Sequence, residues 1–159
     1  MKDDITYQKL RIAPVGTGLS IGTVRSLMRL VSDGEQYCVL QRSNGEVCRV
    51  RELCNGTIIT RPCSDLTPVS PDEFVEARDV DIDISGPRER SERAIALATE
   101  FAVAGPTSAR VLLDRFDACE SDIHGATTEL RAAGLIKPTT VHGERGYRAT
   151  ERVSDALAP

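Results

Sequence analysis

The stretch that decides the fold is "LRAAGLIKPTTVHGERGYRAT", residues 130–150. It begins as the end of an apolar helix that stops at Gly134, and glycine permits the left-handed conformation common at helix ends. Two strand-like runs follow, and the polar, glycine-bounded segment "VHGERGY" between them predicts a hairpin tip. The stretch therefore predicts a helix that leads directly into a long hairpin containing several cations.

More helices are expected on both sides of this stretch. Apolar residues at helical spacing predict a long helix over residues 88–103. A second helix is expected to begin after Thr107 or Ser108, and a third after its cap, Ser121, because hydroxyl side chains favour the N-cap position. A short closing helix, capped by Thr150, follows the hairpin. The order is therefore three helices, a hairpin and a final helix.

Three segments, "LLDRF", "SDIHGATTELRAAGLI" and "GERGYRATERV", occur in this order between Arg93 and Leu157. They resemble the winged-helix domains of MarR- and PadR-type regulators. The resemblance implies a recognition helix for the major groove of DNA and a hairpin, the wing, for the flanking backbone. The DNA-contacting residues that it implies are Ser121, His124, Thr128, Arg131, Lys137, Arg145 and Arg148.

The first half of the chain is predicted to be rich in β-strands. Asn44-Gly45 and Asn55-Gly56 each lie between strand-like runs, which is the strongest short-range signal for a hairpin. They predict a three-stranded meander over about residues 36–43, 46–54 and 57–63. A two-residue turn would pair Cys54 with Thr57 and place Pro62 opposite Arg49, where its missing N–H costs nothing.

Strand alternation in this register predicts two different faces. The core face would contain Tyr37, Val39, Cys48, Val50, Ile59 and Cys63. The other face would contain Arg42, Arg49 and Arg51, together with Leu40, Leu53 and Ile58. Ser70 would then cap a short helix that starts at Pro71, and Asp79–Ile84 alternates like an edge strand. An SH3-like barrel or a rolled meander is the expected result.

The sequence thus predicts an α+β protein with two domains. The β-rich domain would comprise residues 1–84, the hinge and helix start residues 85–92, and the winged-helix domain residues 93–159. Within the first domain, residues 18–30 predict an amphipathic helix with Met28 and Val31 inward. About nine of these residues resemble the recognition helix of sigma-factor-type modules, but three nearby Pro and Gly residues interrupt the place of the supporting helix.

The cysteines and the hydropathy limit the classes of protein that remain. The five cysteines contain no C-x-x-C pair, and their odd number fits poorly with a disulfide framework, so buried reduced thiols are expected. A zinc site is less favoured because paired ligand spacings are absent, and no metal or other cofactor is expected. The chain has no run of about 18 apolar residues and no apolar leader. We therefore expect a cytoplasmic protein without a membrane segment.

Charge gives two opposing indications about DNA. The net charge is −4, from 20 basic and 24 acidic residues, whereas phosphate contacts need local positive charge. Between residues 131 and 152 there are five cations and only two carboxylates, which favours DNA. An acidic corner opposes DNA by like-charge repulsion, and it contains Asp114, Asp117, Glu120 and Asp122.

These observations predict a non-enzymatic transcriptional regulator that binds double-stranded DNA as a homodimer. Neither His124 nor His142 has a nucleophile or an acid that the sequence places beside it, which disfavours an enzyme. The β-rich half would provide dimerisation or partner binding. The alternative is an adaptor or inhibitor, such as a phage- or plasmid-encoded protein, that engages host transcription, replication or defence machinery. Its partner-binding residues would be Arg42, Arg49 and Arg51.

Overall fold

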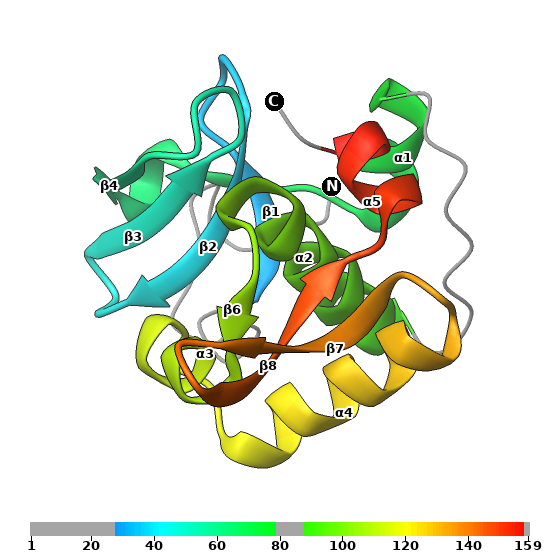
Figure 1. The fold of residues 1–159 in the computed structure, drawn as a ribbon. Helices are drawn as coiled ribbons and strands as arrows, with labels where there is room; N and C mark the ends of the chain where they lie inside the picture. Colours follow the sequence, from blue (N-terminus) through cyan, green and yellow to red (C-terminus); the bar gives the residue numbers. More distant parts are fainter. Residues whose placement is uncertain (1–27, 79–87, 158–159) are drawn as a thin grey trace.

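The computed structural model describes residues 28–78 and 88–157 and has a mixed α+β architecture (Figure 1). The N-terminal part is an antiparallel sheet of five strands in the order β4-β3-β2-β1-β5. Its strands are β1 (Arg29–Ser32), β2 (Tyr37–Ser43), β3 (Val47–Glu52), β4 (Ile58–Pro62) and β5 (Thr67–Pro68). The described residues of this part also form the short helices η2 (Cys63–Asp65) and α1 (Pro71–Arg78). The predicted meander is confirmed, but the sheet is open and does not close into a barrel.

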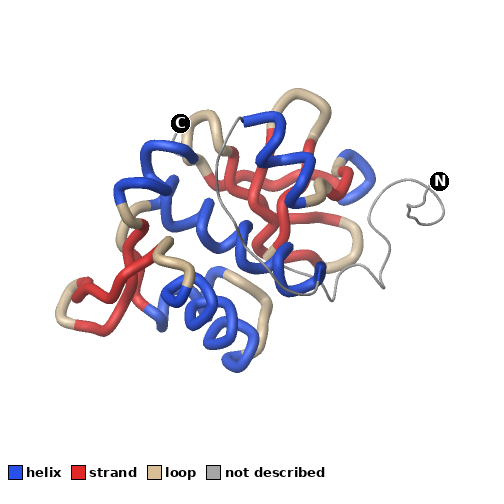
Figure 2. The backbone as a smooth tube through the Cα atoms, turned by 90° about the vertical axis from the view of Figure 1, so that its right-hand side faces the viewer, coloured by secondary structure: helices blue, strands red, loops and turns tan. Residues whose placement is uncertain are grey.

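The C-terminal part contains four helices and a three-stranded sheet in the order β6-β8-β7 among the described residues. Its elements are α2 (Arg88–Ala104), β6 (Thr107–Ser108), α3 (Ala109–Arg115), α4 (Glu120–Ala132), β7 (Ile136–Val141), β8 (Glu144–Ala149) and α5 (Glu151–Leu157). Figure 2 shows α2 crossing the middle of the molecule, with the larger sheet on one side and the β7–β8 hairpin projecting on the other.

Most of the predicted helix starts are confirmed. Ser108 caps α3 by accepting a hydrogen bond from the Val111 N–H at 3.2 Å, and Ser70 accepts one from Glu73 at 3.1 Å at the start of α1. The start of α4 is different, because Cys119 and not Ser121 is its N-cap, and no side chain caps it. The first turn of α4 therefore includes Ser121.

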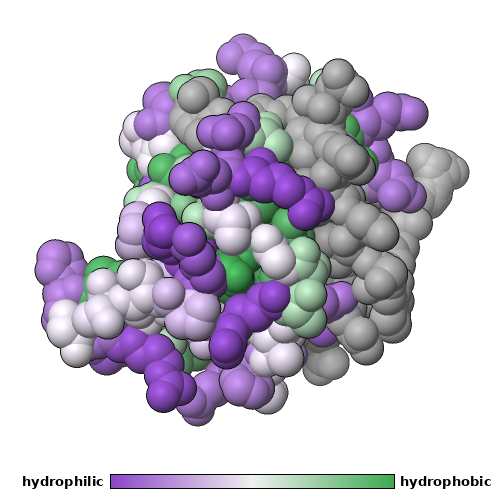
Figure 3. All heavy atoms as spheres, turned by 45° about the vertical axis from the view of Figure 1, so that its right-hand side comes forward, coloured by the Kyte–Doolittle hydropathy of each residue, from purple (hydrophilic) through white to green (hydrophobic). Residues whose placement is uncertain are grey.

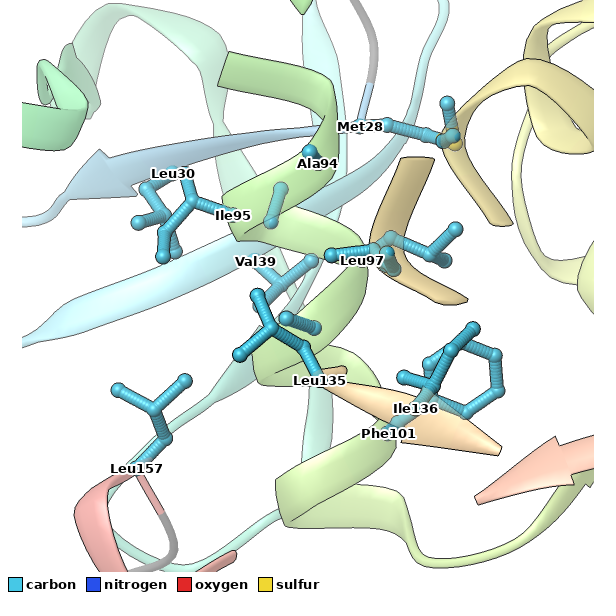
Figure 4. Close-up of a cluster of buried hydrophobic side chains, with 14 of the residues drawn as sticks. Met28, Leu30, Val39, Ala94, Ile95, Leu97, Phe101, Leu135, Ile136 and Leu157 are labelled. Carbon is cyan, nitrogen blue, oxygen red and sulfur yellow. The ribbon is translucent and has the colours of Figure 1, made fainter. Parts of the chain in front are cut away.

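The main hydrophobic core is shared between the two parts of the chain. Helix α2 is buried without interruption from Ala94 to Phe101, as expected of a helix that other elements cover on all sides. Figure 4 shows Leu30 and Val39 of the larger sheet in the same cluster as Leu135 and Ile136 of the C-terminal part. Because one core serves both parts, we expect them to unfold together.

The hairpin between β3 and β4 differs from the predicted register by two residues. Gly56 donates to the Glu52 carbonyl and Glu52 donates to the Thr57 carbonyl, so the turn is longer than the expected two residues. Pro62 therefore pairs with Val47 and not with Arg49. A shift by two residues keeps every side chain on its predicted face, because the strand repeat is two.

A β-bulge in β2 changes the predicted faces. The pairing shifts by one residue between Leu40 and Arg42, and a shift of one exchanges the two faces of the strand. Tyr37 and Val39 consequently pack in the main core instead of beside Val50. A second cluster on the other face contains Val31, Cys38, Leu40, Cys48, Val50, Cys63 and Leu66. Both faces of the sheet are thus partly buried.

The predicted helix over residues 18–30 is wrong at its end, because Arg29–Ser32 forms strand β1 between β2 and β5. The rest of that helix and the predicted edge strand Asp79–Ile84 lie outside the described residues. Burial explains why this segment is a strand and not a helix. Leu30 is buried in the main core, and the next residue, Val31, is buried in the second cluster on the opposite face of the sheet. That alternation is the behaviour of a strand.

The cysteines also differ from the expectation of five buried thiols. Cys48 and Cys63, which are 15 positions apart in the sequence, form a disulfide within the second cluster. Cys38 is buried and free, whereas Cys54 and Cys119 are exposed. Burial raises the pKa of the Cys38 thiol to about 12, with Asp33 and Glu52 adding to the effect.

Alkylation of the native protein without reductant should therefore label Cys54 and Cys119 only. The thiolate is the reactive form, and Cys38 is both covered and protonated, while the disulfide protects the remaining pair. Peptide mass spectrometry after iodoacetamide treatment at mildly alkaline pH measures the labelled positions. Label on Cys48 or Cys63 would contradict the disulfide.

A buried ionic cluster joins the larger sheet to α2. The carboxylate of Glu100, which has no exposed surface, accepts hydrogen bonds from Arg51 at 2.9–3.0 Å and from Gln41 at 3.1–3.2 Å. Arg115 at the end of α3 donates to the same carboxylate at 3.0 Å. A buried charge is tolerated only when such partners satisfy it.

Glu100→Ala should destabilise the protein by about 3–5 kcal/mol, because it leaves the buried Arg51 guanidinium without its carboxylate. Urea unfolding followed by circular dichroism measures the change. The matched control is Glu46→Ala, since Glu46 is an exposed carboxylate between β2 and β3, and its loss should cost under about 0.5 kcal/mol. A similar small loss for Glu100→Ala would mean that the cluster contributes little.

Candidate nucleic-acid interface

Helix α4 presents the four predicted recognition residues on one exposed face. Its inward residues are Ile123, Ala126, Thr127 and Leu130, which are all buried. Ser121, His124, Thr128 and Arg131 are exposed. Their spacing of three, four and three residues keeps them on a single stripe of the helix. The structure thus brings these side chains together at the surface, over the whole length of α4.

The β7–β8 hairpin lies where the sequence predicted it, but its turn is shorter than the predicted tip "VHGERGY", because β8 already begins at Glu144. His142 and Gly143 form its two-residue tip with φ values of 51° and 79°, which are typical of a type I′ turn. Arg145 lies one residue pair beyond Val141–Glu144, opposite Thr140, and is exposed. It therefore lies beside the tip and not at its apex.

The close pairing of β8 with β6 explains why residue 146, the second glycine of "GERGY", is a glycine. Strand β6 pairs with β8 through Ser108 and Gly146. A Cβ atom on Gly146 would lie 2.5 Å from the Thr107 carbonyl oxygen and 2.8 Å from the Ser108 Cα. Only glycine allows this approach of two backbones. This glycine therefore supports the fold, while its neighbours Arg145 and Arg148 extend into solvent.

Lys137 and Arg148 are direct cross-strand partners on the hairpin, and both are exposed. Like charges directly opposite each other destabilise a sheet. Alternation along the strands places this pair on the face opposite to Thr140 and Arg145. The three predicted hairpin cations are therefore near one another but divided between two faces.

The only carboxylate of the hairpin strands, Glu144, is paired with α3. Arg110 holds it through a fork of two hydrogen bonds, of 3.1 Å from Nε and 2.6 Å from Nη2. The hydrogen bond from Arg110 keeps the pKa of Glu144 below its usual value. The pair ties the hairpin to α3, and it removes the one negative charge among the exposed cations of the hairpin.

The acidic corner lies between α3 and α4, as the sequence predicted. Asp114, Asp117 and Glu120 are exposed there, and Asp122 is half-buried. Glu120 and Asp122 are in the first turn of α4, where carboxylates are favoured by the helix dipole. These carboxylates have a structural reason to be present, but they also oppose the approach of a polyanion.

The three arginines of the predicted partner-binding surface all have partners within the chain. Arg51 is buried against Glu100. Arg42 donates to the Asp114 carbonyl, and Arg49 donates to the Arg115 carbonyl at 2.9 Å. Because α2 and α3 cover the sheet face that these arginines share, they form contacts within the chain. Arg51 is thereby removed from the surface, whereas Arg42 and Arg49 remain half-buried.

Sequence reasoning missed the two ionic contacts that organise this region. Arg110 and Glu144 are 34 residues apart, and Arg51 and Glu100 are 49 apart, so neither pair has a local pattern. One signal was present for Glu100: a carboxylate within the apolar segment "AIALATEFAVA". A charge at such a position requires a buried partner.

Among the described residues, no group of three or more His, Cys, Asp or Glu side chains is placed to hold a metal ion. None of the described helices is long and apolar enough to cross a membrane. On the face in Figure 3, hydrophilic residues cover most of the described surface, with apolar residues in small areas between them.

The described residues thus form a mixed α+β protein with three exposed cations on the β7–β8 hairpin and one, Arg131, on α4. By sequence, the chain belongs to a family of unknown function (DUF7346), whose family model matches residues 28–159. No curated protein matches the chain, and no solved structure does.

Lys137→Glu should stabilise the protein by roughly 0.2–1 kcal/mol, because it replaces a like-charge pair with an opposite-charge pair across the hairpin. Thermal unfolding at low salt measures the gain. Arg145→Glu is the matched control, since its cross-strand neighbour Thr140 is uncharged and no gain is expected. An unchanged or lower stability of Lys137→Glu would show that the two cations do not repel each other.

Proposed function

We propose that residues 88–157 form a winged helix of the MarR or PadR kind and bind double-stranded DNA. The support is the order α2-β6-α3-α4-β7-β8-α5, with a short corner between α3 and α4 and a hairpin directly after α4. In this proposal α4 is the recognition helix and the β7–β8 hairpin is the wing. The α+β fold itself is compatible with many functions. The support for DNA binding must therefore come from the charges and side chains on the surface.

The observation that carries the proposal is the set of cations on this surface. These cations are Arg131, Lys137, Arg145 and Arg148. None of the four forms an ion pair with a residue that the structure describes. Lys137 and Arg148 are kept opposite each other although this costs stability. An anionic ligand would compensate for that cost, and the phosphates of DNA are closely spaced anions.

The proposed roles follow from the position of each side chain. Helix α4 would lie in the major groove, where Ser121, His124, Thr128 and Arg131 face base edges. The wing residues Lys137, Arg145 and Arg148 would contact phosphates on its flank. One recognition helix reads only a half-site, and we therefore propose a homodimer acting as a transcriptional regulator.

The acidic corner favours a second candidate, a protein-binding adaptor or inhibitor of the phage or plasmid type. Exposed carboxylates at the start of α4 would repel phosphate but would suit a basic protein surface. The two candidates differ in their response to salt. Binding to DNA weakens steeply with salt because counterions are released, whereas a mostly apolar protein contact does not show this dependence.

Arg145→Ala should weaken binding to specific and unrelated duplexes about equally and lower the salt slope by about one unit, because one phosphate contact is lost. His124→Ala, Thr128→Ala and Arg131→Ala should instead alter the preference between sequences. Fluorescence anisotropy on selected and random duplexes over a salt series measures both effects.

The acidic corner provides the control for this prediction. Asp117→Asn and Glu120→Gln should tighten binding to DNA, because each removes a repulsive charge without changing the size of the side chain. If Arg145→Ala left the affinity for DNA untouched and the salt slope of the native protein were near zero, the DNA proposal would be wrong. A protein partner recovered from lysate after nuclease treatment would then favour the adaptor.

A further inference from the structure

The end of helix α3 is held by the larger sheet. Arg42 donates to the Asp114 carbonyl oxygen from Nε at 3.2 Å and from Nη2 at 2.7 Å. Arg49 donates to the next carbonyl oxygen, that of Arg115. In the reverse direction, the Asp117 N–H donates to the Gln41 carbonyl at 3.2 Å. Two adjacent strands of the N-terminal part, β2 with its bulge and β3, therefore contact one short segment.

These contacts satisfy groups that the helix itself leaves open. The last carbonyls of an α-helix have no partner within the helix, and a glycine in the left-handed region commonly supplies the ending. The residue after α3, Phe116, is instead extended, with φ −102° and ψ 139°. Cationic donors at a C-terminus also complement the helix dipole. The two arginines thus take the place of a local capping motif.

The segment that they hold leads directly into the proposed recognition helix. Only residues 116–119 separate the end of α3 from the start of α4. Phe116 is fully buried, so this connection has little freedom at its first residue. The side chain of Arg115 is fixed as well, through its hydrogen bond to Glu100 on α2. The place where α4 begins is therefore set by contacts on both sides of α3.

We propose that Arg42 and Arg49 are positioning residues for α4, through which the N-terminal sheet sets the orientation of the recognition helix. The inference rests on the proposed DNA binding for its functional consequence, but the positioning itself is independent of any ligand. The N-terminal sheet is then a part of the DNA-reading unit. A rearrangement of the bulge or of the β2–β3 turn would alter binding although neither touches DNA.

The first arm of the test is amide hydrogen exchange measured by NMR. In Arg42→Ala, exchange at Asp117 should become about fivefold faster, since each hydrogen bond of this kind contributes about that factor. The double variant Arg42→Ala/Arg49→Ala should show a larger increase. Amides of α2 report global unfolding. Their exchange rates should change little, because Arg42 and Arg49 are only half-buried and belong to neither hydrophobic cluster.

Arg61→Ala is the matched control. Arg61 belongs to the same sheet, but it pairs with Asp33 and Glu52 through contacts of 3.5–3.7 Å, away from α3. Its substitution should leave exchange at Asp117 unchanged. If the double variant Arg42→Ala/Arg49→Ala also leaves this exchange unchanged, or if α2 accelerates equally, the positioning proposal is overturned.

The second arm uses DNA and the conservative variant. Positioning predicts that Arg42→Ala and Arg42→Lys both weaken binding to a random duplex of about two helical turns, roughly fivefold for alanine, with an unchanged salt slope. Lysine keeps the charge but cannot reproduce the two-donor fork of arginine. Full rescue by lysine, with a slope lower by about one unit in the alanine variant, would instead make Arg42 a direct phosphate contact and overturn the proposal.

The two arms keep the two proposals separate. If the native protein binds no duplex at any salt concentration, the proposed DNA function fails, and the exchange arm still decides whether the sheet positions α4. If the native protein binds DNA with a steep salt slope but exchange at Asp117 is unaffected by the substitutions, the DNA function stands and the positioning role fails.

Discussion

The interaction on which the rest of the structure depends is the contact of the Glu100 carboxylate with Arg51, Gln41 and Arg115. These partners come from β3, from the bulge of β2 and from the end of α3, so one buried group fixes three elements relative to α2. A buried ion cluster of this kind adds little stability compared with well-packed apolar residues. Removal of one member nevertheless destabilises the fold strongly, because it leaves a buried charge without a partner. We infer that its main contribution is specificity, because only one placement of the sheet on α2 satisfies the carboxylate.

This specificity is needed because α2 offers few other features for orientation. Most of its buried stretch consists of alanine, leucine and isoleucine side chains, which pack in several ways at similar cost. The apolar core sets how strongly the two parts associate, and the ionic cluster sets how they are oriented. An orientation fixed in this way reaches α4, because Arg115 is both a member of the cluster and the last residue of α3.

The sequence predicted elements that depend on local chemistry and missed contacts between distant segments. The hairpin after α4, the Ser108 cap and the exposed stripe of α4 follow from turn preferences, capping and helical spacing. The faces of β2 could not be predicted, because a single bulged residue between Leu40 and Arg42 exchanges them and no local signal marks it. The contacts of the arginines could not be predicted for a different reason, since they depend on α2 and α3 covering the face that the arginines share. The disulfide between Cys48 and Cys63 likewise required the register of β3 against η2.

The described cations divide into two groups along the chain, and this division bears most directly on function. Those before α4 with a described partner are engaged within the molecule: Arg29, Arg42, Arg49, Arg51, Arg61, Arg110 and Arg115. Those on α4 and the hairpin, from Arg131 to Arg148, have no ion pair within the described part of the chain. A protein with a net charge of −4 has carboxylates available to neutralise them, and surface ion pairs of long side chains form easily. The one hairpin carboxylate, Glu144, is instead held by Arg110 of α3. The structure thereby leaves cations without an ion pair among the described residues mainly on the hairpin, whereas α4 carries one cation, Arg131, and the three carboxylates Glu120, Asp122 and Glu129. On charge alone, a polyanion would therefore be attracted to the hairpin and the end of α4, and repelled from the start of α4.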